Sequence, residues 1–275
     1  MMKPAGEMRE ILLKLADAVI SNVTDCILHS DDFDKIVMEK SRDVTRKLDM
    51  VAEDTLEAYL LEHDLSARII SEELGDRVFP SGEDPAFTLV FDPVDGSTNA
   101  SRGIPFFCTS IAYAPKVKDV GFDDITIGIV KTAYGRTYHA VRGEGAFLDD
   151  KKIDVGHIER DRRKKQIFCI YSYGVNQLPH GILEFGGRNI IRVLGSIAIE
   201  MCLLAQGALD GIIEVRDVMN GYDIMASSLI LKEAGGILTD TAGEPIRALA
   251  DVKGISFVGA RDEGTHDQIL RILKG

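Results

Sequence analysis

The segment LVFDPVDGSTNA, residues 89–100, ends a hydrophobic run in two aspartates that are followed at once by Gly-Ser-Thr. Val90 and Phe91 are typical of the end of a buried strand, and the proline and glycine that follow favour a turn. Asp92 and Asp95 are therefore expected at the carboxyl end of a strand, with backbone amides and two hydroxyls directly behind them. Carboxylates that converge away from water repel one another unless protons or cations neutralise them. The segment thus predicts a site that does chemistry rather than a turn that only packs.

Length and charge limit the classes of protein to which this chain could belong. Its 275 residues suffice for one large domain or two modest ones, each with a full core. The 32 Lys and Arg against 44 Asp and Glu give a net charge of −12. An acidic surface repels the phosphates of nucleic acids, so no nucleic-acid partner is expected. A small phosphorylated substrate remains compatible with this charge if cations neutralise it locally.

Cysteine usage and hydropathy indicate the compartment. Cys26, Cys108, Cys169 and Cys202 are far apart and show no CxxC spacing, which is typical of small core residues in a reducing compartment. No apolar stretch approaches the roughly 20 residues that span a bilayer, and the N-terminus lacks the apolar core of a signal peptide. The sequence predicts a cytoplasmic protein with no membrane partner.

Hydrophobic periodicity predicts strands and helices that alternate in blocks. Helices are expected over residues 5–30, 44–64, 196–206 and 223–234 and at the C-terminus. Strands are expected over residues 67–75, 85–93, 108–114, 125–133, 136–143, 167–173, 189–193, 209–215 and 255–260. The charged run 156–166 predicts an exposed connection between two halves, residues 1–160 and 161–275. The pattern favours a layered α/β (α+β) fold over a single doubly wound parallel sheet.

Further acidic residues stand at the ends of predicted elements. Glu72 and Glu73 follow a strand, Asp49 lies near the start of the second helix, and Asp223 lies at the start of a later one. Taken singly, a Glu pair is more often on the surface, and an Asp at a helix start is more often an N-cap. Together with D-P-V-D-G-S-T, these residues favour Mg²⁺, a hard ion that takes oxygen ligands and keeps water for a substrate phosphate.

The residues after the two aspartates extend this interpretation. Gly96, Ser97 and Thr98 would offer backbone amides at a helix N-terminus, which is a natural seat for phosphate. No Cys, Ser–His or Lys nucleophile pattern lies nearby in the sequence. Metal ions beside a phosphate seat suggest hydrolysis by metal-activated water.

Five segments resemble, in order, the blocks of the inositol monophosphatase superfamily: SEELG (71–75), FDPVDGSTNASRGIPFFCTSIAYA (91–114), RGEGAFLDDKKI (142–153), GSIAIEMCLLAQGALDGIIE (195–214) and YDIMASSLILKEAGG (222–236). DGIIEVRDVMNGYD (210–223) is similar to the archaeal-type inositol-1-monophosphatase/fructose-1,6-bisphosphatase branch. The resemblance extends over nearly the whole chain. It implies an αβαβα sandwich, a Mg²⁺-dependent and lithium-sensitive phosphatase, and a homodimer.

By position, the resemblance implies two to three Mg²⁺ ions at the site. Glu72, Asp92 and the Val94 carbonyl would hold the first ion. Asp92, Asp95 and Asp223 would hold the second. Glu72 also lies near a third, weaker site, and it is counted among the catalytic residues.

The resemblance also assigns roles in catalysis and substrate binding. Ser97 takes the position of a hydroxyl that orients the attacking water together with a helix aspartate, for which Asp49 is the candidate. TRKLD places Asp49 four residues after Thr45, whereas three is the commoner spacing in the family. The residues that correspond to contacts with the sugar or polyol are Arg192, Gly195, Ser196 and Glu214.

The expected substrate is inositol 1-phosphate, fructose 1,6-bisphosphate or both. Arg216 adds a cation that could meet a second phosphate or form a surface salt bridge. A haloacid-dehalogenase-type phosphatase is disfavoured, because one residue rather than two separates its paired aspartates. A 3′-phosphoadenosine-type nucleotide phosphatase and a non-catalytic metal- and phosphate-binding regulatory protein remain alternatives. Residues 30–42 and 77–85 are candidates for a lid.

Overall fold

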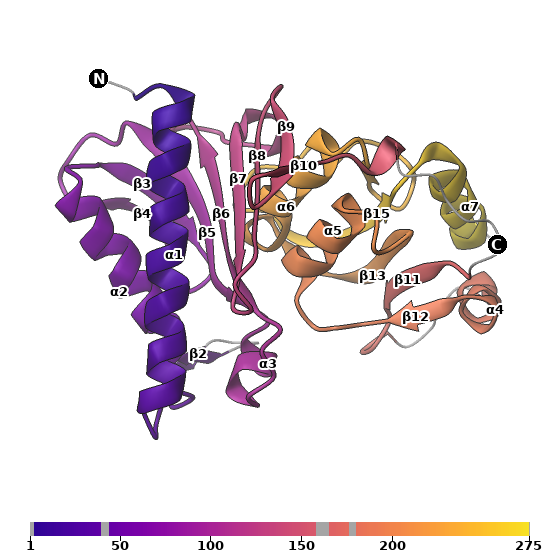
Figure 1. Cartoon of the computed structure of the whole chain (residues 1–275), viewed down its shortest axis with the longest axis horizontal. Helices are drawn as coiled ribbons and strands as arrows, with labels where there is room; N and C mark the ends of the chain where they lie inside the picture. The colour runs from indigo at the N-terminus through magenta and orange to yellow at the C-terminus, as the bar shows by residue number, and fades with distance from the viewer. Residues whose placement is uncertain (1–2, 40–43, 158–164, 176–179, 275) are drawn as a thin grey trace.

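Helices alternate with sheets in five layers in the computed structural model, which describes residues 3–39, 44–157, 165–175 and 180–274 (Figure 1). Helices α1 (Ala5–His29) and α2 (Lys47–Glu62) form one outer layer. Between the two large sheets lie α5 (Ile197–Ala205) and α6 (Gly221–Glu233). The other outer layer consists of α4 (His180–Arg188) and α7 (Glu263–Lys274). This order confirms the predicted αβαβα sandwich.

The larger sheet has eight strands and carries the aspartate-rich segment. In spatial order they are β10 (Lys151–Ile153), β9 (Gly145–Leu148), β8 (Thr137–Val141), β7 (Ile127–Thr132), β6 (Cys108–Ala114), β5 (Phe87–Asp95), β3 (Ala67–Ser71) and β4 (Gly75–Phe79). Neighbours are antiparallel except β3 and β5, which run parallel with Ser71 opposite Phe91. Glu72, which directly follows β3, therefore lies beside Asp92 of β5.

Each face of the larger sheet is covered by helices with apolar surfaces. On the outer face, Leu15 and Val19 of α1 and Leu56 of α2 are fully buried in one cluster with residues of the sheet. On the inner face, α6 packs directly on the strands, and β7 has a glycine where the two elements meet. A Cβ atom on Gly128 would lie 2.5 Å from the carbonyl oxygen of Ala226. The glycine thus permits an approach that a larger residue would block.

The smaller sheet has five strands, in the order β12 (Ile190–Arg192), β11 (Ile167–Tyr171), β13 (Gly211–Asn220), β15 (Lys253–Ala260) and β14 (Ile237–Thr239). The first three strands are parallel, with Tyr171 opposite Glu214. Their carboxyl ends therefore meet at one edge of the sheet. In Figure 1 this sheet lies between α5 and the outer helices α4 and α7. The remaining elements are a two-stranded ribbon, one short helix and two 3₁₀ turns: β1 (Ile36–Glu39), β2 (Val44–Arg46), α3 (Ser97–Ser101), Phe122–Asp124 and Val155–His157.

Several predicted boundaries were wrong. The helix expected over 44–64 begins at Lys47, because Val44–Arg46 pair with Ile36–Glu39 in the ribbon. Residues 77–79 of the candidate lid belong to β4 and pair with β3, so they form an edge of the sheet. Strand β13 continues five residues past the predicted end, to Asn220. Short or exposed elements were missed altogether: β1, β4, β9, β10, β14 and α4.

Some predictions concern residues outside the described ranges. These are residues 40–42 of the other candidate lid and residues 158–164 of the charged connection. The two sheets draw their strands from residues 67–153 and 167–260. The division into two halves near residue 160 stays a prediction. Among the described residues, none of the helices combines the length and the apolar character that crossing a bilayer requires.

Candidate active site

The site is built around a break in the pairing of β5. Asp92 lies opposite Ser110 and Asp95 opposite Cys108, so the two residues between them on β5 match a single residue, Thr109, on β6. This irregularity is a β-bulge, a device that bends a strand and redirects its side chains. Val94 lies in the bulge and is 3% exposed. The chain then turns at Gly96, whose φ of +94° favours glycine.

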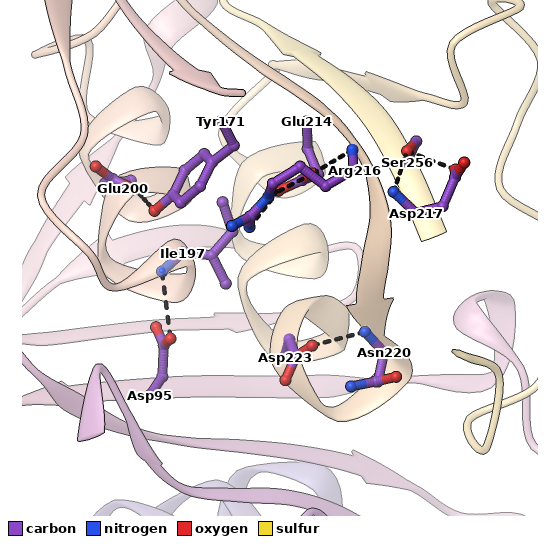
Figure 2. Close-up of polar contacts among 10 residues, drawn as sticks. All are labelled: Asp95, Tyr171, Ile197, Glu200, Glu214, Arg216, Asp217, Asn220, Asp223 and Ser256. Carbon is purple, nitrogen blue, oxygen red and sulfur yellow. Dashed lines mark hydrogen bonds and ion pairs between the residues drawn. The ribbon is translucent and has the colours of Figure 1, made fainter. Parts of the chain in front are cut away.

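Three of the predicted metal ligands converge at this point. Carboxylate oxygens of Glu72, Asp92 and Asp223 all lie within 4.8 Å of one another. Glu72 directly follows β3, Asp92 lies in β5 just before the bulge, and Asp223 comes from the first turn of α6. An oxygen of Asp223 accepts a hydrogen bond from the backbone N–H of Asn220 at 2.6 Å (Figure 2). Asn220, not Asp223, is therefore the N-cap of α6, and Asp223 completes the capping box from the third position of the helix while it belongs to the acidic cluster.

The electrostatics of this cluster fit a hard cation. Asp92 is 2% exposed, and its Oδ1 atom has no hydrogen-bond partner within the part of the chain that the structure describes. Burial raises the pKa of Asp92 well above its ordinary range, and the charges of Glu72, Asp95 and Asp223 raise it further. A buried carboxylate oxygen without a donor is costly unless a proton or a metal ion binds it. The donor set is all oxygen, which suits Mg²⁺.

Asp95 lies outside this trio and contacts the start of α5. Its Oδ2 atom accepts hydrogen bonds from the Ser196 hydroxyl at 2.6 Å and from the N–H of Ala198 at 2.7 Å. Its Oδ1 atom accepts a longer bond, 3.3 Å, from the N–H of Ile197 (Figure 2). Burial raises the pKa of Asp95 to about 6, and these donors limit the rise. Asp95 therefore joins the metal-ligand segment to the helix that follows Gly195.

The predicted phosphate seat and catalytic pair occupy helix starts. Ser97 and Thr98 are the first residues of α3, directly after Gly96. Asp49 lies in the first turn of α2, is 2% exposed, and accepts a hydrogen bond from the N–H of Arg46 at 2.7 Å. The pairing of Asp49 with Ser97, the phosphate seat and the Val94 carbonyl ligand stay predictions.

A buried polar network beneath Glu72 was not predicted. Glu53 of α2 is fully buried and accepts hydrogen bonds from Ser71 and from Arg77, the latter at 2.8 Å. The Thr45 hydroxyl donates to Glu73, which is the neighbour of the metal ligand. The only sequence signal was the position of Glu53, four residues after Asp49, on the buried face of α2.

The predicted substrate residues lie on the smaller sheet and before α5. Gly195 and Ser196 precede α5, and Gly195 has a φ of +89°. Arg192 is exposed and donates to the backbone carbonyl of its neighbour Ile191 at 2.8 Å. An unpredicted residue, Asn99, donates from Nδ2 to the carbonyl of Leu194 at 2.8 Å and thereby links α3 to this segment.

Glu214 is fully buried, and its carboxylate pairs with Arg216 (Figure 2). The closest contact joins Nη2 of Arg216 to Oε2 of Glu214 at 2.6 Å, and the Arg216 side chain is only 7% exposed. The Arg216 guanidinium lies over the rings of Tyr171, at 4.6 Å, and Tyr173, at 4.2 Å. Of the two roles left open for Arg216, the salt bridge is present, but it is buried rather than on the surface.

Comparisons with known proteins agree with this geometry. Residues 6–274 match the inositol monophosphatase family. A fructose-1,6-bisphosphatase/inositol-1-monophosphatase of Methanothermobacter thermautotrophicus is 33% identical over 270 residues, which cover 96% of this chain and 95% of that protein. A bifunctional NADP phosphatase/NAD kinase of Methanococcus maripaludis is 29% identical over 97% of this chain, which spans 49% of that longer protein.

Among solved structures, a hypothetical protein from Pyrococcus horikoshii with similarities to inositol-1 monophosphatase superposes with a TM-score of 0.81. The two chains are 26% identical, and the match covers 99% of this chain and 100% of the other. The fold, the acidic cluster and these similarities lead to one assignment. The chain belongs to the inositol monophosphatase family, a family of metal-dependent phosphatases.

Proposed function

We propose that this chain hydrolyses inositol 1-phosphate, fructose 1,6-bisphosphate or both, and that it uses Mg²⁺ to do so. The observation that carries the proposal is the buried Oδ1 atom of Asp92, which lacks a hydrogen-bond donor in the described structure. Asp92 is one of three residues whose carboxylate oxygens lie within 4.8 Å of one another, and a divalent cation stabilises such an arrangement. Relatives named for these two activities support the choice of substrate.

In this proposal the acidic residues divide the work of binding the metal. Glu72, Asp92 and the Val94 carbonyl would hold the first ion. Asp92, Asp223 and Asp95, the last through its less engaged Oδ1 atom, would hold the second. Two to three ions bind in all. Mg²⁺ supplies an activated water and neutralises the substrate phosphate, which a chain of net charge −12 could not do alone.

The other predicted residues bind and orient the substrate. The backbone amides at Gly96, Ser97 and Thr98 receive the phosphate, and the Ser97 hydroxyl with Asp49 orients the nucleophile. The sugar or polyol contacts Arg192, Gly195, Ser196 and Glu214. Glu214 meets a substrate hydroxyl with its carboxylate already fixed by Arg216, so the ion pair restricts the orientations that a hydroxyl can adopt.

A nucleotide phosphate is the second candidate substrate. Tyr173 is 64% exposed beside Arg216, and an exposed aromatic ring offers a surface on which a base can stack. The relative named NADP phosphatase/NAD kinase matches nearly the whole chain and supports this option. We further propose a cytoplasmic homodimer, inhibition by Li⁺, and a division of the chain into halves at residue 160.

Phosphate release from four substrates tests these proposals. Inositol 1-phosphate, fructose 1,6-bisphosphate, adenosine 3′,5′-bisphosphate and NADP are compared with Mg²⁺, with Mg²⁺ plus Li⁺, and with EDTA. We expect turnover of one of the first two, suppressed by Li⁺ and by EDTA. Preferred turnover of a nucleotide would select the second candidate. Stable binding of Mg²⁺ without release from any substrate would favour the non-catalytic regulatory protein and overturn the proposal.

A further inference from the structure

The segment Leu194–Ser196 connects the metal-ligand segment to the predicted substrate contacts. Ser196 donates to Asp95, and Asn99 donates to the carbonyl of Leu194, so the segment contacts both the metal-ligand loop and α3. A Cβ atom on Gly96 would lie 3.2 Å from the carbonyl oxygen of Gly195, which shows how closely the two loops approach. Displacement of this segment would disturb both the substrate contacts and the surroundings of Asp95.

Glu200 fixes the segment from below. It lies on the first turn of α5 and is fully buried, and its Oε1 atom accepts a hydrogen bond from the N–H of Leu194. Its Oε2 atom accepts the hydroxyl of Tyr171 (Figure 2). Burial raises the pKa of Glu200 to about 7, and the hydrogen bonds of Tyr171 and Leu194 limit that rise. A buried carboxylate is costly, and α5 does not need this one as a cap because Asp95 contacts its first N–H groups.

Tyr171 extends the contact from Glu200 to the Arg216–Glu214 pair. Its hydroxyl binds Glu200, while its ring lies against the guanidinium of Arg216, 4.6 Å from the ring centroid. Arg216 in turn pairs with Glu214. Figure 2 shows Glu200 beside Tyr171, and Tyr171 beside the overlapping side chains of Arg216 and Glu214. One chain of contacts thus joins Leu194 to Glu214, two positions that flank the proposed substrate.

We propose that Glu200 is a positioning residue for the predicted substrate contacts: its carboxylate fixes the Leu194–Ser196 segment directly and the Arg216–Glu214 pair through Tyr171. The expected effect of Glu200 on substrate binding rests on the proposed phosphatase function. The contacts by which Glu200 fixes its neighbours do not depend on that function. Glu200 touches neither the substrate phosphate nor the metal ligands in this account. It acts by restricting the Leu194–Ser196 segment, which contains two of the predicted substrate residues.

Amide hydrogen exchange at Leu194 tests the structural content without any assay of activity. In Glu200→Ala the N–H of Leu194 loses its acceptor, and we expect its exchange to become about 10-fold or more faster. In Glu200→Gln the amide oxygen still accepts, but without charge, so an intermediate increase is expected. Asp210→Asn is the matched control, because Asp210 also accepts a backbone N–H, that of Ile167 at 2.9 Å, at the opposite end of β11. Exchange at Leu194 should not change in this control.

Steady-state kinetics on the same variants test the consequence for the substrate. We expect the KM of Glu200→Ala to rise about 10-fold, more than kcat falls, while Glu200→Gln recovers most of the loss and Asp210→Asn behaves as wild type. Unchanged exchange at Leu194 in both Glu200 variants, or a KM unaffected by either, would overturn the positioning role. Should Glu200→Ala fail to fold, Glu200→Gln decides by the same two readouts. A wild-type protein without phosphatase activity would refute the proposed function and leave the exchange result to decide the role of Glu200.

Discussion

Replacing Asp92 by asparagine should stabilise the metal-free protein at pH 8 and remove its response to Mg²⁺. Asparagine keeps the shape of the side chain but removes one of three converging charges. The oxygens of Glu72, Asp92 and Asp223 lie within 4.8 Å of one another. Two unit charges at that distance repel by about 3 kcal/mol at an effective dielectric constant of about 20. The substitution relieves at least one such repulsion.

The size of the effect should depend on pH in a defined direction. Burial, followed by the charges of Glu72, Asp95 and Asp223, raises the pKa of Asp92 in the folded protein. When the pKa of a carboxyl is higher in the folded than in the unfolded protein, the folded protein loses stability as pH rises above the unfolded pKa of about 3.9. We expect Asp92→Asn to be more stable than wild type by about 3 kcal/mol at pH 8, with a Tm about 6 to 12 °C higher. The difference should vanish near pH 4, where wild-type Asp92 is protonated.

Thermal unfolding in EDTA and in saturating Mg²⁺, between pH 4 and pH 8, measures both effects. Mg²⁺ at about 100 times its Kd should stabilise the wild type by about 2.7 kcal/mol and leave Asp92→Asn nearly unchanged. Asp210→Asn is the control, because Asp210 is also buried but lies 3.5 Å from Arg261. It should lose stability and keep the wild-type response to Mg²⁺. A metal-free Asp92→Asn protein less stable than wild type at pH 8, or an equal response of both to Mg²⁺, would refute the reasoning.

Three further changes test the packing and the buried charges. Arg216→Met leaves Glu214 buried without its cation and should lower the free energy of unfolding in urea by about 3 to 5 kcal/mol. Adding Glu214→Gln should restore part of this loss. A loss below about 1 kcal/mol would contradict the buried pair. Gly128→Ala should lower the free energy of unfolding by about 1 to 3 kcal/mol, because its Cβ would meet a carbonyl at 2.5 Å. Gly6→Ala, with nothing within 4 Å, should raise it by up to about 1 kcal/mol. Equal effects of the two substitutions would argue against the close approach at Gly128. Because burial raises the folded pKa of Glu200 from 4.5 to about 7, the metal-free wild type should lose up to about 3 kcal/mol as pH rises through that interval, and Glu200→Gln should lack this contribution; identical pH dependence of the two would refute the shift.

The long helices and buried strands were predictable because their apolar residues follow a clear period. Strand β5 is buried along nearly its whole length, and its apolar run was evident in the sequence. Strand β4 lacks such a signal, because it lies at the sheet edge and three of its five residues are exposed. Strands β10 and β14 have three residues each, too few to show a period. The sequence therefore predicted the buried strands but missed the short or exposed strands at the sheet edges.

Polar residues whose partners are distant in sequence account for the other differences. The prediction ended β13 at Val215, and one of the two roles left open for Arg216 was a surface salt bridge. Arg216 is instead buried, since Glu214 and two aromatic rings surround it. Likewise, nothing in the sequence near Glu200 indicates that Tyr171, 29 positions away, shares its carboxylate. The convergence of Glu72, Asp92 and Asp223 was accessible because the D-P-V-D-G-S-T motif and the family resemblance both pointed to it.

Phosphate release from inositol 1-phosphate, measured while Mg²⁺ is titrated into metal-free protein, tests the central claim most directly. The account predicts no release without Mg²⁺, a saturable rise as Mg²⁺ is added, and background rates for Asp92→Asn at every Mg²⁺ concentration, with fructose 1,6-bisphosphate run in parallel. Release that is independent of Mg²⁺, or wild-type rates from Asp92→Asn, would contradict the claim that the buried acidic cluster binds the metal that drives hydrolysis.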